Sequence, residues 1–332
     1  MSQLNVNVVA PLGYTGPNLP GDSNFVQVVD NTGDTVLKVF GTDNAAIGKD
    51  ALNSNTTGAR NIAIGTSALQ ANTTAASNVA IGYESMKDST NKQNSVAIGF
   101  RALKVGATGS VAVGSSAGSS CAQSIVAVGN NALPSSTGTG NTGVGFQAGY
   151  QYTTGTDNTF LGFLSGSGNV TTGSKNTCVG SASGTTIDGN NNTCIGYNAQ
   201  VSGGGASNEF ILGDANVAVL SCAQTTITSL SDARDKKEVE ELPVGLNFVQ
   251  KLKPVKFVWD DRNEDGKHDI KDFGFIAQDL KAAQEEEGVA DYLKLVYEAN
   301  PEKLQASYGK LVPILVKAIQ ELTAKVEELE AK

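Results

Sequence analysis

The first two thirds of the chain repeat one short pattern of apolar and small residues. Segments such as NIAIGTSAL, NVAIGYESM and SVAIGFRAL place an apolar residue before a glycine eleven times, at intervals of 15 to 18 residues. The apolar positions are Ile47, Ile64, Ile81, Ile98, Val113, Val128, Val144, Leu161, Val179, Ile195 and Leu212. Four residues further on, the first ten copies carry only alanine or serine. Such a period indicates a solenoid whose coils stack and cover one another's apolar faces.

The constant residues predict the shape of one coil. A coil of this length fits two short strands and two corners. The fixed glycine allows a backbone conformation or a close approach that a side chain would block, and the fixed alanine or serine fits a narrow interior. Seven copies begin with an asparagine, which tolerates a left-handed backbone and can stack into amide ladders: Asn44, Asn61, Asn78, Asn141, Asn158, Asn176 and Asn192. At a strand spacing of ~4.8 Å, the coils would extend over roughly 50 Å.

A single thin roll would leave much apolar surface exposed, so neighbouring chains are expected to cover it. Residues 44–214, with repeats such as NSVAIGFRAL, resemble the YadA-like head of trimeric autotransporter adhesins, and the same roll occurs in viral fibres. The resemblance implies a left-handed parallel β-roll, or solenoid, that forms a trimer. The preceding FVQVVDNTGDTVLKVF predicts a hairpin turning at residues 31–33, which caps the roll or joins it to a particle.

The last hundred residues predict a small α+β domain. Residues 244–252 form an amphipathic pattern that ends before Pro254, residues 255–259 alternate like a strand, and DFGFIAQDLKAAQEEEG predicts a second strand and a helix. The segment from residue 306 to the end predicts a long helix. Its apolar residues follow a heptad seam, at Leu315, Ile319, Leu322, Val326 and Leu329. This seam predicts a coiled coil that needs partner helices or packing against the rest of the chain.

The density of charged residues changes at residue 231, where the last hundred residues begin. Residues 1–230 carry 8 Lys/Arg and 11 Asp/Glu, whereas residues 231–332 carry 16 and 22. We therefore expect a cap or attachment region at 1–43, the β-roll at 44–214, a β linker at 215–230 and a separate domain at 231–332. Both parts are acidic, at −3 and −6, which argues against a nucleic-acid partner.

Composition argues against several classes of protein and of site. No apolar run reaches the roughly 18 residues of a membrane span, and the start, MSQLNVNVVAPLGYTG, lacks the basic and apolar regions of a secretory signal. The single histidine, His268, argues against histidine-based triads and zinc sites. The four cysteines fit a chain made in a reducing cytosol. Cys178 and Cys194, at equivalent positions in adjacent copies, are interpreted as small buried residues in preference to a disulfide.

The C-terminal motifs SDARDKK, LNFVQKLKPVKFVW, FGFIAQDL and LVPILVKAIQELTAKVEELEAK occur in this order within residues 231–332. They resemble the C-terminal intramolecular chaperone autoprocessing domain of phage tailspikes and endosialidases. The resemblance implies a domain that trimerises, templates the β-structured region upstream and then cuts itself off. It also implies that a serine-lysine dyad, Ser231 and Lys236, cleaves the bond between Leu230 and Ser231, with Asp232 and Arg234 in support.

The chemistry of such a dyad is demanding. A serine hydroxyl is a poor nucleophile until a base takes its proton, and a lysine accepts a proton only where burial or neighbouring cations lower its pKa. Arg234 and Lys237 are such neighbours, and Asp232 is expected to orient or cap. From the spacing alone, the alternative is a capped helix start, with Ser231 or Asp232 as the cap and the following charges on a solvated face.

A second motif lies in DRNEDGKHDIKD, residues 261–272. It places acidic or amide side chains at positions 1, 3, 5, 9 and 12 of a calcium-loop template: Asp261, Asn263, Asp265, Asp269 and Asp272. The alternative is an acidic hairpin tip that turns at Asp265 and Gly266 between two strands. No cofactor is required by this interpretation, and calcium is the candidate ligand.

Together these patterns predict a structural virion protein, made in the host cytoplasm, that forms a homotrimeric fibre or tail spike. Expected partners are other virion or tail proteins and a host receptor, and the only expected enzymatic act is one self-cleavage without external substrate. One alternative is a bacterial surface adhesin, which would need a signal peptide and an anchor. Another is a glycan-degrading tailspike with paired carboxylates, drawn from Glu84, Asp88, Asp157, Asp188, Glu209 and Asp214.

Overall fold

The computed structural model describes residues 26–29, 35–40, 43–121, 124–168, 172–217, 219–221, 223, 229–260, 268–298, 300–302 and 304–332. The chain divides into two compact units, Met1–Asp214 and Ala215–Lys332, which are described separately.

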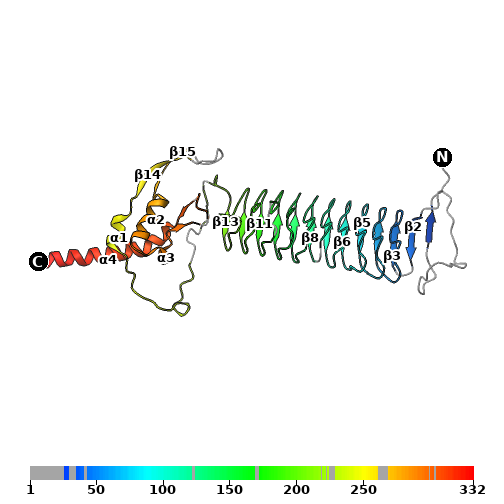
Figure 1. Ribbon diagram of the computed structural model, residues 1–332, viewed down its shortest axis with the longest axis horizontal. Helices are drawn as coiled ribbons and strands as arrows, with labels where there is room; N and C mark the ends of the chain where they lie inside the picture. The colour runs from blue at the N-terminus through cyan, green and yellow to red at the C-terminus, as the bar shows by residue number, and fades with distance from the viewer. Residues whose placement is uncertain are drawn as a thin grey trace. The chain divides into compact units, whose positions relative to one another are not determined.

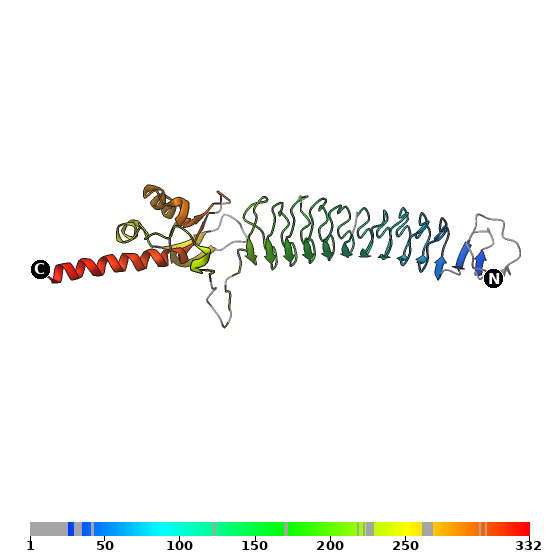
Figure 2. The same ribbon diagram turned by 90° about the horizontal axis from the view of Figure 1, so that it is seen from below.

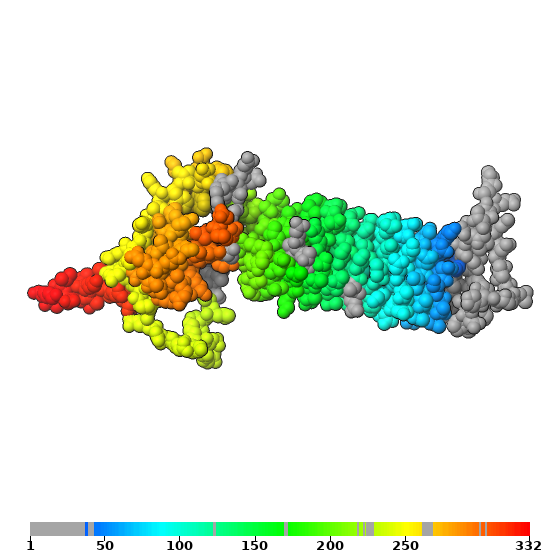
Figure 3. Space-filling view, viewed as in Figure 1, coloured from blue at the N-terminus to red at the C-terminus, as the bar shows by residue number. Residues whose placement is uncertain are grey.

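The first unit is a β-solenoid of about ten turns, as the repeat predicts. Eleven short strands pair in chain order, each parallel to the next and without a shift of register (Figures 1 and 2). They are β3 (Asn44–Ile47), β4 (Ile62–Ile64), β5 (Val79–Ile81), β6 (Val96–Ile98), β7 (Val111–Val113), β8 (Val126–Val128), β9 (Thr142–Val144), β10 (Thr159–Leu161), β11 (Thr177–Val179), β12 (Thr193–Ile195) and β13 (Phe210–Leu212). In the space-filling view the coils pack directly against one another (Figure 3).

Each coil contains one strand, so the expectation of two strands per coil was wrong. On the second side the chain bends through left-handed residues such as Leu52 (φ 52°) and Leu69 (φ 50°), which an extended strand does not accommodate. Hydrogen bonds between coils continue there without a strand: the Leu52 N–H donates to the Ala68 carbonyl at 2.9 Å, and the Leu69 N–H donates to the Ser85 carbonyl at 3.0 Å.

The interior is as narrow as the fixed small residues predict. The middle residue of most strands points inward and is fully buried, and it is alanine in β4 to β8. In β10 this position is Phe160, which is also fully buried. Its ring fits because glycines stand nearby: a Cβ atom at Gly149 or Gly166 would lie 2.9 or 2.2 Å from the ring. A large side chain thus replaces alanine at this position, and the neighbouring glycines leave the space that it fills.

The glycine that ends each strand permits close contact between coils. Gly145 has a φ of +135°, and a Cβ atom there would lie 2.3 Å from the Gly162 carbonyl oxygen of the next coil. Glycine is required at this position both by the backbone conformation and by the approach of the neighbouring backbone.

The asparagines form the predicted ladder along one corner. The N–H of Asn61 donates to Asn44 Oδ1 at 2.8 Å, and the N–H of Asn176 donates to Asn158 Oδ1 at 2.9 Å. The amide nitrogen of each side chain donates to a main-chain carbonyl, as Asn176 Nδ2 does to the Gly189 carbonyl at 2.9 Å. These bonds pair buried polar groups at the corner of every coil that carries asparagine there.

In the three-residue strands β4 to β13 the first and third residues point outward, and the third residue, always Ile, Val or Leu, forms an apolar row along the ladder, joined in β4 to β8 by an apolar first residue. Among them, Ile62 is 41% exposed and Leu161 is 45% exposed in the single chain. Just beyond the strands, the Tyr83 and Phe100 rings stack at 5.5 Å, and the Phe146 and Phe163 rings stack at 5.4 Å. One chain therefore leaves a long row of apolar side chains open to solvent.

A hairpin covers the N-terminal edge of the ladder. Strand β1 (Val26–Val29) pairs antiparallel with β2 (Thr35–Phe40), and β2 pairs antiparallel with β3. The predicted turn at residues 31–33 lies outside the described residues. The added strands occupy one of the two sheet edges that a solenoid leaves open.

The second unit follows the predicted order of elements. Helix α1 (Leu246–Lys251) precedes the antiparallel pair β14 (Val255–Asp260) and β15 (His268–Gly274), which α2 (Ala277–Glu286) and α3 (Ala290–Leu293) follow. Next, the short strands β16 (Val296–Tyr297) and β17 (Gln305–Ala306) form an antiparallel pair. A 3-10 turn (Tyr308–Lys310) then leads to α4 (Leu311–Glu330). The buried core comprises Val244, Phe248, Ala283, Val289, Leu293, Leu295, Leu311 and Ile314.

Helix α4 packs on this core only through its first turns. Leu311, Ile314 and Ala318 are buried, whereas the predicted heptad residues are exposed, from Leu315 at 43% to Leu329 at 69%. In Figure 3 the C-terminal part of α4 extends beyond the other elements of its unit. Within the described residues, no helix has both the length and the apolar character needed to cross a membrane.

Candidate functional site

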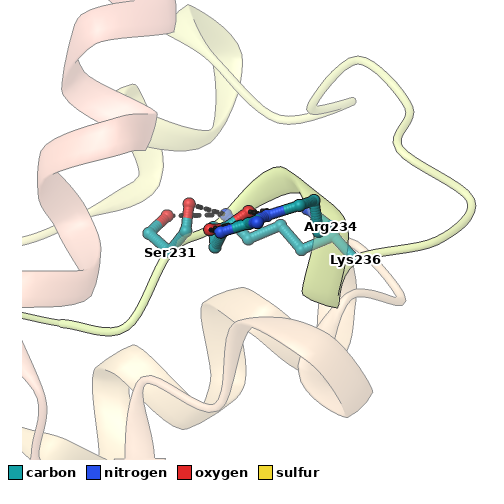
Figure 4. A network of polar contacts seen from close by, with 4 residues as sticks. Ser231, Arg234 and Lys236 are labelled. Atoms are coloured by element: carbon teal, nitrogen blue, oxygen red, sulfur yellow. Dashed lines mark hydrogen bonds and ion pairs between the residues drawn. The ribbon is translucent and has the colours of Figure 1, made fainter.

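The structure places Ser231 and Lys236 side by side. The short 3-10 turn Ala233–Asp235 reverses the chain between them, so that Lys236 Nζ lies 2.6 Å from Ser231 Oγ and 3.5 Å from the Ser231 carbonyl oxygen (Figure 4). Ser231 before the turn and Lys236 after it thus form a hydrogen-bonded serine-lysine pair.

Asp232 and Arg234 build the turn itself. Asp232 is its N-cap, and one carboxylate oxygen accepts the Arg234 N–H at 2.9 Å. The Arg234 guanidinium also binds both carboxylate oxygens, at 3.0 Å through Nε and 2.5 Å through a terminal nitrogen. The hydrogen bonds from Arg234 lower the pKa of Asp232. An ionised Asp232 acts here as a cap and as a partner of Arg234, in a geometry suited to both the capping and the orienting role.

The proton arrangement sets the chemical requirement of the pair. In the 2.6 Å contact, Lys236 Nζ is the donor and Ser231 Oγ is the acceptor. To activate the serine, the amine must be neutral so that the hydroxyl can donate to it. In the single chain Leu230, Ser231 and Lys236 are all exposed, with Leu230 fully so. The pair therefore has the contact that general-base catalysis needs, and it lacks the dry surroundings that favour a neutral amine.

Only part of the candidate calcium loop can be compared. Asp261, Asn263 and Asp265 lie outside the described residues. Asp272 accepts from Trp259 Nε1 at 3.1 Å, and the ring of His268 contacts Asp260 at 3.2 Å, across the β14–β15 pair. The described flanks are two antiparallel strands, which is the setting of a hairpin tip. Among the described residues, no group of three or more His, Cys, Asp or Glu side chains is placed to hold a metal ion.

The cysteines within the described residues are buried free thiols: Cys121, Cys178 and Cys194. Cys178 and Cys194 are direct partners in the parallel ladder, in the interior column that alanine occupies in earlier coils. Burial raises the pKa of Cys121 to about 12. These thiols are small interior side chains, in agreement with the interpretation from sequence.

The acidic residues of the solenoid are engaged in structural contacts. Glu84 binds Lys87 at 2.8 Å and Arg101 at 2.7 Å, and the hydrogen bonds from these two cations lower the pKa of Glu84 to about 2. Asp188 accepts from Thr172 Oγ1 at 2.8 Å. A glycosidase needs one carboxyl group whose pKa is raised so that it can act as an acid. The pKa of Glu84 is instead lowered, so this carboxyl group is ionised and does not suit the role of the acid.

The Glu84 cluster was missed from sequence, although a signal was present. Glu84 and Arg101 are 17 residues apart, one repeat period, and occupy the same position in adjacent coils. Opposite charges at that spacing meet side by side in a solenoid. A second missed feature is the pair of charged α4 residues, Lys317 and Glu321, whose partners lie more than 70 residues earlier in the chain.

Comparison with known proteins bears on the C-terminal unit. Searches of curated proteins and of solved structures gave no match. A scan against protein-family models matched residues 231–289, which begin at the serine of the dyad and end after α2. The C-terminal region of this chain, preceded by a β-solenoid, thus matches the family described as chaperone of endosialidase, as its motifs predicted.

Proposed function

We propose that this protein is a trimeric fibre or tail-spike component of a virus particle, and that its C-terminal unit is an intramolecular chaperone that cleaves itself off. The observation that carries the proposal is the match of residues 231–289 to the chaperone of endosialidase, directly after a β-solenoid. The chaperone family implies trimeric assembly of fibre proteins.

Two surfaces of the single chain support assembly. The outward Ile and Val residues of the solenoid ladder and the heptad residues of α4 are both exposed rows of apolar side chains. Association of three chains along each row would remove them from water, and the short heptad seam needs partner helices to be stable.

A chaperone at the C-terminus would help three repetitive chains to pair in the correct phase. The coils of the solenoid are nearly identical, so chains that pair one coil out of phase lie close in energy to the correct trimer. Long-range β pairing is also slow. Trimerisation of the C-terminal unit would fix the phase of the three chains before the solenoids associate. Removal of the template would then leave the folded fibre kinetically trapped.

The proposed cleavage is an acyl shift followed by hydrolysis. Lys236 Nζ takes the proton of Ser231 Oγ, which attacks the carbonyl carbon of Leu230, and the bond from that carbon to the Ser231 nitrogen breaks. The nitrogen receives the proton from Lys236, and Leu230 becomes an ester on Ser231 Oγ. Water then hydrolyses the ester, which gives a C-terminal carboxylate at Leu230 and a new N-terminus at Ser231. Neighbouring chains would partly cover the exposed pair and so favour the neutral amine, so that the acyl shift follows assembly.

The test is the intact mass of the purified full-length protein beside three variants. Wild type should yield a fragment that begins at Ser231, whereas Ser231→Ala and Lys236→Ala should stay whole. Lys253→Ala, which removes an exposed lysine outside the turn and leaves the pair intact, should still be cleaved. A wild-type chain that folds and remains whole would refute self-cleavage, and one that sediments as a folded single chain would refute the trimer.

Host attachment is the role that such an appendage would serve, with the solenoid as the surface presented to a receptor. Binding of the cleaved fibre to host cells, with the Ser231→Ala protein in parallel, would test it. A folded fibre that does not bind to cells of any host would count against this role.

A further inference from the structure

Helix α4 contacts the chain just downstream of the serine-lysine pair at two points. Lys317 Nζ donates to Glu241 Oε1, and Glu321 Oε2 accepts the N–H of Leu246 at 2.8 Å. Residues 317 and 321 are one helical turn apart and therefore lie on the same side of α4. The hydrogen bond from Lys317 lowers the pKa of Glu241, so that this carboxyl is ionised in the pair.

The contact of Glu321 is built into the backbone of the segment. Leu246 is the first residue of α1, and the N-cap Gly245 supplies no side chain that could pair with the free N–H groups of the helix start. Glu321 takes this role from 75 residues away. A Cβ atom at Gly245 would lie 2.5 Å from Glu321 Oε1, so a side chain there would displace the carboxylate from this position. The buried Phe248 of α1 packs in the same core as Leu311 and Ile314 of α4.

The opposite side of α4 is the exposed heptad seam. Leu315, Ile319 and Leu322 are 43–63% exposed, while Ile314 and Ala318 are buried against the unit. One helix thus joins two functions: its outer side is available to partner helices, and its inner side holds residues 241–246. Only four residues separate Lys236 from Glu241.

We propose that Lys317 and Glu321 are positioning residues that tie the self-cleaving pair to the helix that assembles, so that Ser231 and Lys236 reach their working place only when α4 is fixed among its copies. This inference rests on the proposed function. The two residues act through Glu241 and Leu246 and do not touch the reacting atoms.

Charge reversal in the full-length protein tests whether the contacts of α4 with residues 241–246, here called the tie, position the pair. Glu241→Lys and Lys317→Glu each replace the ion pair by two like charges, and the double variant restores it in the opposite sense. Each single variant should release the Ser231 fragment about tenfold more slowly or worse, because small misplacements of reacting groups are costly. The double variant should recover to within about threefold. Glu240→Lys and Lys325→Glu, which make the same changes at neighbouring exposed positions, should cleave like wild type.

The trimer fraction from sedimentation must be measured on the same samples. Slower cleavage at an unchanged trimer fraction, with rescue in the double variant, supports positioning. Cleavage that falls only in proportion to the trimer fraction, or single variants that cleave like wild type, would overturn it.

Hydrogen exchange in a Ser231→Ala background gives a readout that does not need cleavage. Amides of residues 231–246 should exchange faster in each single variant and regain protection in the double variant. If wild type proves not to cleave, self-cleavage is refuted, and this exchange pattern alone decides on the tie. Reversal with rescue would sustain the tie, and unchanged exchange would overturn it.

Discussion

The hydroxyl group of Tyr308 bridges the backbone of Phe275: it accepts the Phe275 N–H at 3.1 Å and donates to the Phe275 carbonyl at 3.2 Å. The two rings also pack edge to face at 5.6 Å. This contact joins the end of β15 to the turn before α4, two segments 33 residues apart. It depends on Gly274, where a Cβ atom would lie 2.6 Å from the Tyr308 hydroxyl.

Tyr308→Phe should therefore lower the stability of the C-terminal unit by about 1 kcal/mol, because the N–H and the carbonyl of Phe275 both lose this partner. Urea unfolding of the Ser231→Ala protein, followed by the fluorescence of the single tryptophan, Trp259, reports on this unit. Tyr292→Phe, at another exposed tyrosine of the same unit, is the control and should leave the midpoint unchanged. Equal midpoints for both variants would show that the Tyr308 bridge contributes nothing.

The asparagine ladder predicts a large effect from one buried amide. In Asn158→Ala the Asn176 N–H loses its partner, while the Gly173 carbonyl keeps the hydrogen bond from Tyr152, so the solenoid should lose roughly 1–3 kcal/mol. Thermal unfolding by circular dichroism measures the loss. Asn130→Ala removes an exposed amide and should shift the melting temperature little. A shift of the same size in both variants would mean that the ladder is not what holds this corner.

Glycine at the end of each strand predicts an intolerant position. Gly145→Ala would place a Cβ atom 2.3 Å from the Gly162 carbonyl oxygen at a φ of +135°, and should cost at least about 3 kcal/mol. In Gly205→Ala, by contrast, the added Cβ atom meets nothing within 4 Å. The yield of folded, soluble protein and its melting temperature distinguish the two variants. Wild-type behaviour of Gly145→Ala would contradict the close contact between coils.

The Glu84 cluster predicts a defined dependence of stability on pH. Because the folded pKa of Glu84, about 2, lies below its ordinary value of 4.5, ionised Glu84 stabilises the folded chain above pH 4.5. That contribution is lost as the pH falls through about 2.

The melting temperature of wild type should accordingly exceed that of Glu84→Gln at neutral pH, and the gap should close between pH 4.5 and 2. Asp43→Asn, at an exposed left-handed position where asparagine is well tolerated, serves as the control. A gap that stays constant down to pH 2 would rule out the ionised Glu84 as its cause.

Much of the fold could be predicted because the repeat imposes it. An apolar-small-apolar-glycine pattern at a nearly constant period leaves few arrangements other than coils stacked in register. The second side of each coil was mispredicted because leucines at its corner adopt left-handed conformations that sequence propensity does not favour. At the candidate site, the resemblance supplied the residues Ser231 and Lys236, and the structure supplied their 2.6 Å contact.

By itself, the sequence determined the stacking of the coils, the small interior, the asparagine ladder and the change of character at Ser231, since each is a local or periodic property. Only the tertiary structure decided which distant residues meet: Glu321 at the start of α1, Lys317 at Glu241 and Tyr308 at Phe275. No period links these pairs, and their partners are backbone groups or single carboxylates. Contacts of that kind leave no pattern along the chain and are set by how the core of the C-terminal unit packs.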